Sequence, residues 1–453
     1  MTTAPHPLTV NEIIDTRPVS GFQILTIVLC SLVLLLDGFD TQAMGFLVPP
    51  IAEELGIPLS AFGPVLSAGL FGLMIGAMSA GPIADRWGRK WAIVVSALAF
   101  GAFSLATPQA DTTGELVTLR FLTGLGLGGA MPNVVALASE YAPKRLQPIL
   151  VTAIFAGMGG GAVLASLVGG ALIPVWGWRS VFYVGGMLPI ALALVLVKAL
   201  PESVRFLTAR GDDSARVAAI IRRIAPDLGE LPAAAATATP GGVPVAELFS
   251  GGRTTGTLLL WVPFFMNLLI LYFILSWLPS LLRQAGMPVA AGITAVMVFS
   301  IGGIIGALVQ GPIMKAFGVF PTMVAEFVVS LGLVVLASLI FANFQLMMAV
   351  TFTLGVSVQG AQAGLNVLSA MYYPTVIRST GVGWALGIGR IGSIVGPIIG
   401  GVMLSMQWTP QQIFMAGAVP AICAAVAVLA SGALQGRASP CHPDAEPAPI
   451  AAH

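Results

Sequence analysis

Twelve apolar segments, each long enough to cross a lipid bilayer, account for most of this chain of 453 residues. A helix that spans the hydrocarbon core needs about 20 mostly apolar residues. Only 9% of the residues are charged, whereas an ordinary soluble domain has about 25%. The sequence therefore predicts an all-α polytopic membrane protein with twelve transmembrane helices. Their approximate limits are residues 22–47, 61–84, 91–108, 114–138, 149–174, 181–199, 256–279, 292–314, 322–341, 347–371, 381–404 and 412–434.

The basic residues indicate how these helices are oriented. With the N-terminus placed inside, sixteen of the 20 Lys and Arg residues lie in inner segments, and only Arg179 and Arg283 lie in outer loops. Cytoplasmic loops of membrane proteins carry such an excess of basic residues. We therefore expect both termini to lie in the cytoplasm. We further expect a monomeric, multi-pass protein of the bacterial inner (cytoplasmic) membrane.

The segments fall into two sets of six, separated by a long inner stretch in which Ser214 to Ile224 is basic and amphipathic. Four sequence matches at an offset of 230 or 231 residues relate the two sets, among them Gly81–Ile83 with Gly311–Ile313. Two similar halves around a midplane cavity are a common architecture of secondary transporters. The expected division is a cytoplasmic N-terminal tail (1–21), an N-terminal six-helix bundle (22–199), a cytoplasmic linker (200–255), a C-terminal six-helix bundle (256–434) and a disordered cytoplasmic tail (435–453).

Four charged residues lie deep within the predicted spans: Asp37 and Asp40 in the first, Arg120 in the fourth and Arg390 in the eleventh. A charge at the centre of a bilayer costs about 2.5–3.5 kcal/mol on insertion scales. Residues kept at that cost are candidates for function. Two acids and two bases can also compensate one another.

Asp37 and Asp40 stand three residues apart, so their carboxylates lie on nearby faces of one helix. Two carboxylates this close in a low dielectric do not both ionise easily, which makes them candidate proton carriers. Arg120 and Arg390 are candidates to hold a substrate carboxylate. The alternatives are structural: a permanent ion pair between Arg120 and a first-span Asp, a cap at a kink near Gly38, or an Arg390 that bonds helix carbonyls or extends to the interface.

Composition argues against several other classes of function. The formal net charge of +1 argues against nucleic acid as a partner. The three His residues, His6, His442 and His453, all lie in the terminal tails, and the Cys residues have no metal-binding spacing. The sequence shows no Ser/His/Asp set and no nucleotide-binding loop. We therefore expect no metal, no cofactor and no enzymatic activity.

The loop between the second and third segments reads Gly81-Pro-Ile-Ala-Asp85-Arg86-Trp-Gly88-Arg89-Lys90. This loop resembles the signature loop of the major facilitator superfamily, and the resemblance implies that family's fold. Gly81 is expected to allow close approach of helices, Gly88 a tight turn, and Asp85 an ion pair with Arg89. In the family this loop acts as a conformational gate, so we expect the same of Gly81, Asp85, Arg86, Gly88 and Arg89.

Charges at the inner ends of other segments are expected to belong to the same gate region. The sixth segment ends Pro-Glu202-Ser-Val-Arg205, which is similar to a signature shared with sugar porters. We expect Glu202 and Arg205 to be gate charges. Glu326 lies about one turn into the ninth segment and is expected to form an inner-face salt bridge with Lys315 or Arg378.

A narrower resemblance rests on Asp37-Gly-Phe-Asp40-Thr in the first segment, Met-Pro-Asn133 in the fourth, and Tyr373-Pro-Thr with Gly-Ile-Gly-Arg390 near the tenth and eleventh. Together these motifs are similar to the aromatic acid:proton symporters, which import hydroxybenzoates, protocatechuate and related ring carboxylates. The resemblance implies that Asp37 and Asp40 are required for transport. The implied partners are a small aromatic carboxylate, a proton and the lipid bilayer.

A flat ring that carries a carboxylate needs a cation, aromatic faces and a few hydrogen-bonding groups. In the superfamily the tenth span lines the cavity, which favours its polar residues. The alternative for each aromatic side chain is packing against lipid or a neighbouring helix. The candidate substrate-binding residues are Arg390, Arg120, Phe39, Asn133, Phe264, Asn267, Tyr272, Gln359, Gln362, Asn366 and Trp384.

The resulting hypothesis is proton-coupled import of hydroxybenzoate- or benzoate-class carboxylates by alternating access. Asp37 or Asp40 would pair with Arg120 until a proton from outside neutralises the carboxylate and frees positive charge for the substrate anion. Alternatives are a proton-coupled efflux antiporter and a porter of another organic acid or of a sugar. Exporters carry a glycine-rich motif in the fifth span, whereas here the pattern runs from Gly392 to Gly401 in the eleventh.

Overall fold

The computed structural model describes residues 10–210, 214–225, 245–250, 252–341, 343–374 and 377–438. Across these ranges every regular element is helical, and twelve segments are long and apolar enough to cross a membrane, which confirms the predicted fold class. The α-helices are α1 (Val10–Thr16), α2 (Gly21–Leu55), α3 (Phe62–Trp87), α4 (Arg89–Ala106), α5 (Thr113–Tyr141), α6 (Gln147–Trp176), α7 (Arg179–Ala199), α8 (Val204–Arg210), α9 (Ser214–Ile224), α10 (Thr254–Gln284), α11 (Val289–Phe317), α12 (Val319–Leu339), α13 (Phe344–Tyr372), α14 (Arg378–Ser405), α15 (Pro410–Ala416) and α16 (Ala418–Ala438). Three 3-10 turns are η1 (Leu59–Ala61), η2 (Thr107–Gln109) and η3 (Val245–Phe249).

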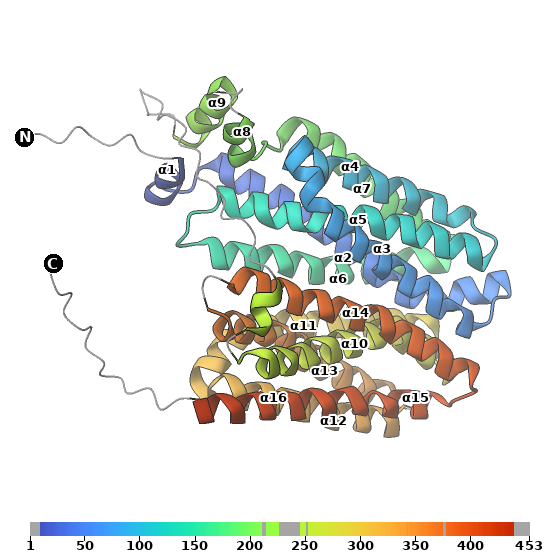
Figure 1. The fold of residues 1–453 in the computed structure, drawn as a ribbon. Helices are drawn as coiled ribbons and strands as arrows, with labels where there is room; N and C mark the ends of the chain where they lie inside the picture. The colour runs from blue at the N-terminus through green and yellow to red at the C-terminus, as the bar shows by residue number, and fades with distance from the viewer. Residues whose placement is uncertain are drawn as a thin grey trace, which may run out of the picture.

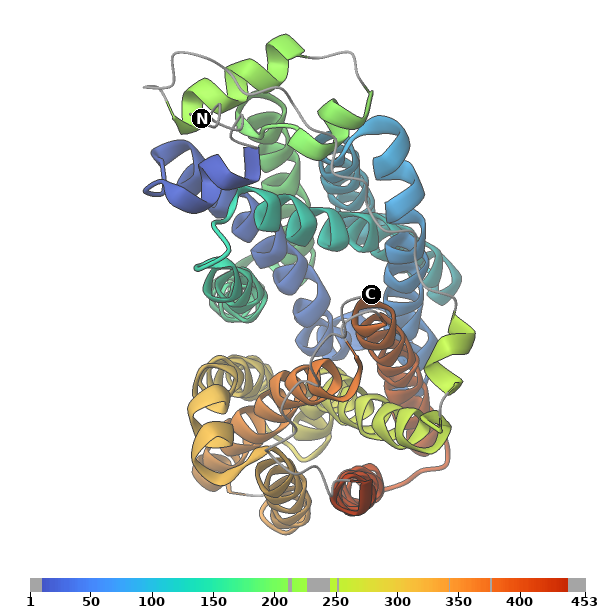
Figure 2. The ribbon, with the colours of Figure 1, turned by 60° about the vertical axis from the view of Figure 1, so that its left-hand side comes forward.

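The membrane helices form two groups that lie side by side (Figure 1). Helices α2 to α7 pack mainly with one another and are called the N-terminal half; α10 to α16 do the same and are called the C-terminal half. The main contacts between the halves are those of α3 with α14, α6 with α11 and α2 with α10. Figure 2 shows the two halves from a second direction, with α14 reaching toward the N-terminal half. A site between the halves is therefore framed by α2, α10 and α14.

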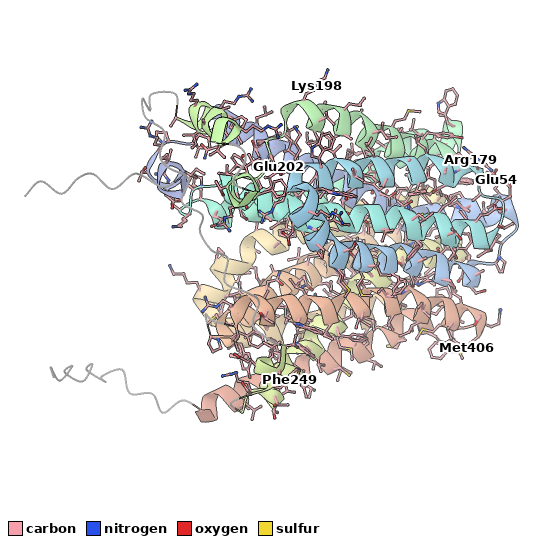
Figure 3. The ribbon with its side chains drawn as sticks, turned by 45° about the horizontal axis from the view of Figure 1, so that its top comes forward. Glu54, Arg179, Lys198, Glu202, Phe249 and Met406 are labelled. Atoms are coloured by element: carbon pink, nitrogen blue, oxygen red, sulfur yellow. The ribbon has the colours of Figure 1, made fainter. Side chains whose placement is uncertain are left out.

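The two ends of the bundle differ in character. Helices α1, α8 and α9 lie at one end, together with Lys90, Lys198 and Glu202; we call it the basic end (Figure 1, Figure 3). The opposite end, here called the far end, carries Glu54 and Arg179, which form an ion pair (Figure 3). This asymmetry matches the excess of basic residues predicted for one side of the membrane.

The internal repeat is visible in the packing of equivalent helices. A Cβ atom at Gly124 of α5 would lie 1.9 Å from the carbonyl oxygen of Gly69 on α3. A Cβ atom at Gly355 of α13 would lie 2.0 Å from the carbonyl oxygen of Phe299 on α11. Small residues let the backbones of membrane helices approach closely, and no side chain fits at either crossing. Gly124 and Gly355 are related by the 231-residue offset found in the sequence.

The helices extend beyond the apolar segments that predicted them. Helix α2 continues through Pro49 and Pro50 to Leu55, whereas the predicted first span ends at residue 47. Proline is tolerated in membrane helices because neighbouring groups satisfy the freed backbone carbonyls. The last predicted span is divided at Gly417 into α15 and α16. Hydropathy thus predicted the number of spans correctly but not their ends.

Candidate functional site

Asp40 and Arg120 form a two-pronged ion pair inside the N-terminal half. Arg120 Nη1 donates to Asp40 Oδ1 at 3.1 Å, and Arg120 Nη2 donates to Asp40 Oδ2 at 2.8 Å. Both residues are only 4% exposed. Ser104 Oγ of α4 lies 3.4 Å from Asp40 Oδ1 as a further donor. Each charge therefore has its partner within the same half, which is the arrangement of the predicted permanent pair.

Asp37 lies one turn earlier on α2 and has a different environment. It is 1% exposed, and its Oδ1 accepts a hydrogen bond from Thr41 Oγ1 at 3.1 Å. Its other oxygen, Oδ2, is buried without a hydrogen-bond partner. A buried carboxylate oxygen without a partner is costly if the group is charged, and protonation removes that cost. Asp37, unlike Asp40, therefore has a carboxylate oxygen to which the surrounding protein donates no hydrogen bond.

Arg390 of α14 faces Asp37 from the opposite half. Arg390 lies near enough to Asp37 for the two opposite charges to attract each other. Arg390 is half-buried; its Nη1 lies 3.4 Å from the hydroxyl of Tyr272, and its Nη2 lies 3.5 Å from Met131 Sδ. Met131 belongs to the N-terminal half and Tyr272 to the C-terminal half. The Arg390 guanidinium therefore lies at the boundary between the halves, where its two terminal nitrogen atoms contact neutral groups.

A small cavity lies beside Arg120, the partner of Asp40, and beside Tyr272, the neighbour of Arg390. It has a volume of about 30 Å³, and its lining includes Thr41, Arg120, Tyr272 and Ser276. A polar cavity of this size is large enough for a water molecule. Thr41, whose hydroxyl donates to Asp37, thus also lines a space that Arg120 and Tyr272 border.

The predicted polar residues of the C-terminal half form one connected group. Asn267 Nδ2 of α10 donates to the Val358 carbonyl at 3.1 Å and to Gln362 Oε1 at 3.0 Å. Asn267 Oδ1 is buried without a partner, so this group retains an unused acceptor. Gln359 lies against Gly303 of α11, and Asn366 is exposed. The structure thus joins Asn267 with Gln362 and leaves Gln359 and Asn366 outside their hydrogen bonds.

Four other predicted substrate residues make contacts of a different kind. Asn133 Nδ2 donates to the Gly129 carbonyl of its own helix at 2.9 Å. Phe39 packs toward Gly185 of α7, and Phe264 is fully buried in a core cluster of the C-terminal half. Trp384 is 43% exposed and stacks on Trp261, with ring centroids 6.1 Å apart. Asn133 thus bonds within its own helix. The three aromatic side chains pack against neighbouring side chains or lie at the protein surface, which is the alternative to substrate binding named above.

A network of charges at the basic end ties α4, α5 and the end of α7 together. Arg89 forms an ion pair with Glu140 of α5, and Arg205 Nε lies 3.9 Å from the same carboxylate. Ser203 Oγ donates to Glu140 Oε2 at 2.6 Å. Sequence reasoning did not single out Glu140, which lies two residues beyond the predicted end of the fourth span. An acid at a span end that faces a basic loop was the available signal.

Glu202 and Gly88 explain the turn that begins α4. Glu202 Oε1 accepts a hydrogen bond from the Lys90 backbone N–H at 3.0 Å. Gly88 has φ +93°, and a Cβ there would lie 2.3 Å from Glu202 Oε2. This φ is rarely adopted by residues other than glycine. The predicted tight turn at Gly88 is therefore confirmed, with Glu202 packed directly against it.

Other expectations for this loop are corrected by the structure. Asp85 and Arg86 are exposed, and Arg89 pairs with Glu140 instead of Asp85, because Arg89 is the first residue of α4 and faces α5. No atom of another residue lies within 4 Å of a Cβ placed at Gly81, so Gly81 is not at a close helix contact here.

Glu326 has a different partner from the one expected. Its Oε2 accepts a hydrogen bond from Gln310 Nε2 at 3.2 Å, and no ion pair to Lys315 or Arg378 is found for it among the described residues. Lys315 and Arg378 are exposed at the basic end, whereas Glu326 lies deeper, between α11 and α13.

Direct hydrogen bonds between the halves are concentrated toward the far end. Arg283 Nη2 donates to Glu53 Oε1 at 2.7 Å. Ser67 Oγ donates to the Ile394 carbonyl at 2.7 Å, and Ser300 Oγ donates to Gln42 Oε1 at 3.2 Å. Within the described residues, the remaining such bond is the contact of Arg390 with Met131 at mid-depth. The halves are therefore closed against each other at the far end.

Comparisons with known proteins agree with this architecture. Residues 30–334 match the profile of the Major Facilitator Superfamily. The chain is 40% identical to a 4-hydroxybenzoate transporter PcaK of Pseudomonas aeruginosa, over 95% of this chain and 97% of that protein. It is 41% identical to a gallate transporter of Pseudomonas putida (96% and 97% covered) and 33% identical to a benzoate transport protein of Acinetobacter baylyi (93% and 92% covered).

Solved structures share the fold at low sequence identity. A D-xylose-proton symporter is 16% identical with a TM-score of 0.71, covering 91% of this chain and 97% of its own. A bacterial homologue of the lysosomal transporter Spinster, in an inward-facing and occupied conformation, is 17% identical with a TM-score of 0.72, covering 93% and 99%. These likenesses concern the fold. The profile match and the relatives above show that the chain belongs to the major facilitator superfamily, within its family of aromatic acid:proton symporters.

Proposed function

We propose that this protein is a proton-coupled importer of aromatic carboxylates of the hydroxybenzoate and benzoate class, working by alternating access. The observation that carries the proposal is the relation of Asp37 to Arg390. Asp37 has one oxygen without a hydrogen-bond partner, and near it, in the other half, lies Arg390, whose contacts with side chains of the described residues are with the neutral groups of Tyr272 and Met131. The names of the relatives supply the class of substrate.

Arg390 is the proposed anchor for the substrate carboxylate. A guanidinium binds a carboxylate through two parallel N–H groups, and the hydroxyl of Tyr272 lies beside it. The Tyr272 ring offers an aromatic face to the substrate ring. Asn267 and Gln362 are the proposed partners of ring hydroxyl groups, because Asn267 Oδ1 is an acceptor without a donor. This assignment stays within the residues predicted for the substrate.

Asp37 is the proposed proton carrier, and the pair of Asp40 with Arg120 is its fixed support. While Asp37 is charged, its field lowers the attraction of Arg390 for a second anion. A proton on Asp37 removes this competition and the cost of the unpartnered oxygen, so substrate and proton favour each other's binding. In this proposal Arg120 stays paired with Asp40 during the whole transport cycle. This differs from the hypothesis drawn from the sequence, in which protonation frees Arg120 for the substrate anion.

We infer that the basic end faces the cytoplasm, as the distribution of Lys and Arg predicts. The closed far end then corresponds to the outer side, and this structure to a state from which substrate leaves inward. The division into bundles 22–199 and 256–434 with a cytoplasmic linker is part of the same proposal.

Exporters carry the glycine-rich motif in the fifth span, whereas here the pattern lies in the eleventh, on α14, and this placement argues against efflux. A Cβ at Gly392 would lie 2.1 Å from the Phe265 carbonyl oxygen, and one at Gly400 would lie 2.3 Å from Trp277 Nε1. These glycines thus serve the contact of α14 with α10 inside one half.

The test is uptake of radiolabelled 4-hydroxybenzoate by the purified protein in liposomes. With the outside acidic, the substrate should accumulate above its outside concentration, and a protonophore should abolish the accumulation. Unlabelled benzoate or gallate should compete, whereas xylose should not. Preloaded liposomes that instead expel substrate when the outside is made acidic would indicate an antiporter and contradict the proposal.

A further inference from the structure

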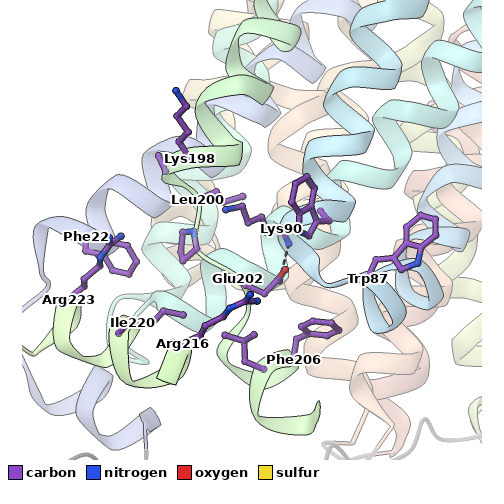
Figure 4. A pocket seen from close by; sticks show the side chains of 15 residues that line it. Phe22, Trp87, Lys90, Lys198, Leu200, Glu202, Phe206, Arg216, Ile220 and Arg223 are labelled. Atoms are coloured by element: carbon purple, nitrogen blue, oxygen red, sulfur yellow. Dashed lines mark hydrogen bonds between the residues drawn. The ribbon is translucent and has the colours of Figure 1, made fainter. Parts of the chain in front are cut away.

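A cavity of about 860 Å³ lies at the basic end, within the N-terminal half (Figure 4). Its wall is formed by the beginnings of α2 and α4, the ends of α3 and α7, and helices α8 and α9. Its lining contains none of the residues around Asp37 and Arg390. Cavities of a few hundred to about 1,000 Å³ commonly bind small ligands. Because this cavity is separate from the proposed substrate site, a ligand that binds in it would be different from the transported acid.

The charge of the lining is strongly positive. Lys90, Lys198, Arg216 and Arg223 contribute four cations, and Glu202 is the acid of the set (Figure 4). Glu202 is already engaged, because its Oε1 accepts two backbone N–H groups at 3.0 and 2.8 Å. Such a lining attracts an anion with several acceptor oxygens, such as a phosphate.

Aromatic side chains place this cavity at the level of the membrane surface. Trp87, the last residue of the membrane helix α3, is 57% exposed, and Trp91, in the first turn of the membrane helix α4, is 48% exposed. The guanidinium of Arg223 lies 5.5 Å from the ring centroid of Phe22. Exposed Trp residues at helix ends are typical of the region of lipid head groups.

Helix α9 fixes two of the cations in position. Its apolar residues Val217, Ile221 and Ile224 are buried in a core cluster of the N-terminal half. Arg216 and Arg223 of the same helix therefore line the cavity from a helix that is packed onto the bundle. The amphipathic stretch found in the sequence thus serves to hold cations beside the membrane helices.

An apolar surface continues from the cavity into the membrane. Beyond Trp91 on α4, Val95 and Leu98 are exposed, and on the adjoining helix α7 Leu194 and Val195 are exposed. A free phosphate would not use this surface, whereas the acyl chains of a lipid would lie against it. The combination distinguishes a lipid from a soluble anion.

We propose that this cavity binds the head group of an anionic phospholipid from the cytoplasmic leaflet. The phosphate lies among Lys198, Arg216 and Arg223, and the acyl chains follow α4 and α7. Basic pockets on the cytoplasmic side of membrane helices bind such head groups. The bound lipid would hold α9, part of the connection between the two halves, against the membrane.

The test is native mass spectrometry of the protein released from bilayers of phosphatidylethanolamine with phosphatidylglycerol or cardiolipin. The wild type should retain an anionic lipid in preference to phosphatidylethanolamine. Arg216→Gln/Arg223→Gln should weaken retention about 25-fold, from about 1 kcal/mol per cation. The matched control Lys144→Gln/Lys315→Gln removes two exposed cations of the basic end outside the cavity, and it should retain the lipid like the wild type.

Two further measurements keep the result interpretable. Lys198→Gln, at an exposed position, should weaken retention several-fold even if the double variant does not fold. Inorganic phosphate at millimolar concentration should fail to displace the lipid. Equal retention by the Arg216/Arg223 variant and the control, or displacement of the lipid by phosphate, would overturn the proposal.

Discussion

Both carboxylate oxygens of Asp40 accept hydrogen bonds from the Arg120 guanidinium, at 3.1 and 2.8 Å, and each of the two residues is 4% exposed. Asp37, on the same helix one turn away, leaves an oxygen without any partner. The two acids that share one motif in the sequence therefore differ in their physical state. This difference leads to separate predictions for stability and for coupling.

Asp40→Asn should mainly destabilise the fold. The variant leaves the Arg120 guanidinium buried without a counter-charge, and breaking a buried pair in this way costs about 3–5 kcal/mol. The midpoint of thermal unfolding in detergent should fall clearly. The double variant Asp40→Asn/Arg120→Gln removes the stranded charge and should recover part of the loss. A single variant as stable as the wild type would show that the pair is not structural.

Arg390→Lys should weaken substrate binding while leaving stability near that of the wild type. Lysine keeps the charge but loses the two-pronged geometry, and a lost charge-assisted hydrogen bond is worth about 1.5–3 kcal/mol. Isothermal titration with 4-hydroxybenzoate should therefore give about a 10- to 100-fold higher Kd. Lys315→Gln, at an exposed cation of the basic end, is the control and should bind like the wild type. Unchanged affinity of Arg390→Lys would remove Arg390 from the substrate site.

Tyr272→Phe should have a smaller effect of the same kind. The hydroxyl lies 3.4 Å from Arg390 Nη1, and a hydrogen bond of this type contributes about 0.5–1.5 kcal/mol. The expected Kd is about two- to tenfold higher. Tyr183→Phe on α7, where the side chain is 40% exposed, is the matched control without an expected effect. Equal changes in both variants would point to a general loss of protein quality.

Gly88→Ala and Gly81→Ala should separate two glycines of one loop. At Gly88 the φ of +93° and the nearby Glu202 carboxylate oppose a side chain, with a backbone cost of about 1–3 kcal/mol. At Gly81 a Cβ meets nothing within 4 Å. Thermal unfolding should therefore show a lower midpoint for Gly88→Ala and a midpoint near the wild type for Gly81→Ala. Similar midpoints for the two variants would contradict the proposed role of Glu202 at the turn.

Much of the fold followed from the sequence because a bilayer imposes simple requirements. The length and apolarity of the segments predicted the twelve spans, and the 231-residue offset identified Gly124 and Gly355 as equivalent positions in the two halves. Helix ends were less predictable, because Pro49 and Pro50 continue α2 in a membrane setting.

The candidate site was predictable in its residues but not in its pairing. Asp37, Asp40, Arg120 and Arg390 stand out because charges in membrane helices are costly. Which acid meets which base depends on the rotation of α2 against α5 and α14, which a single sequence does not report. The same limitation explains Phe39 and Phe264, which lie in helices near the site but face other helices.

The most direct test of the coupling account is to compare two modes of transport by Asp37→Asn in liposomes. Asn keeps the shape of a protonated Asp, so the variant should still exchange labelled for unlabelled 4-hydroxybenzoate across the membrane. It should no longer accumulate the substrate when the outside is acidic, whereas the wild type should do both. Accumulation by Asp37→Asn at the wild-type level under the same proton gradient would contradict the account.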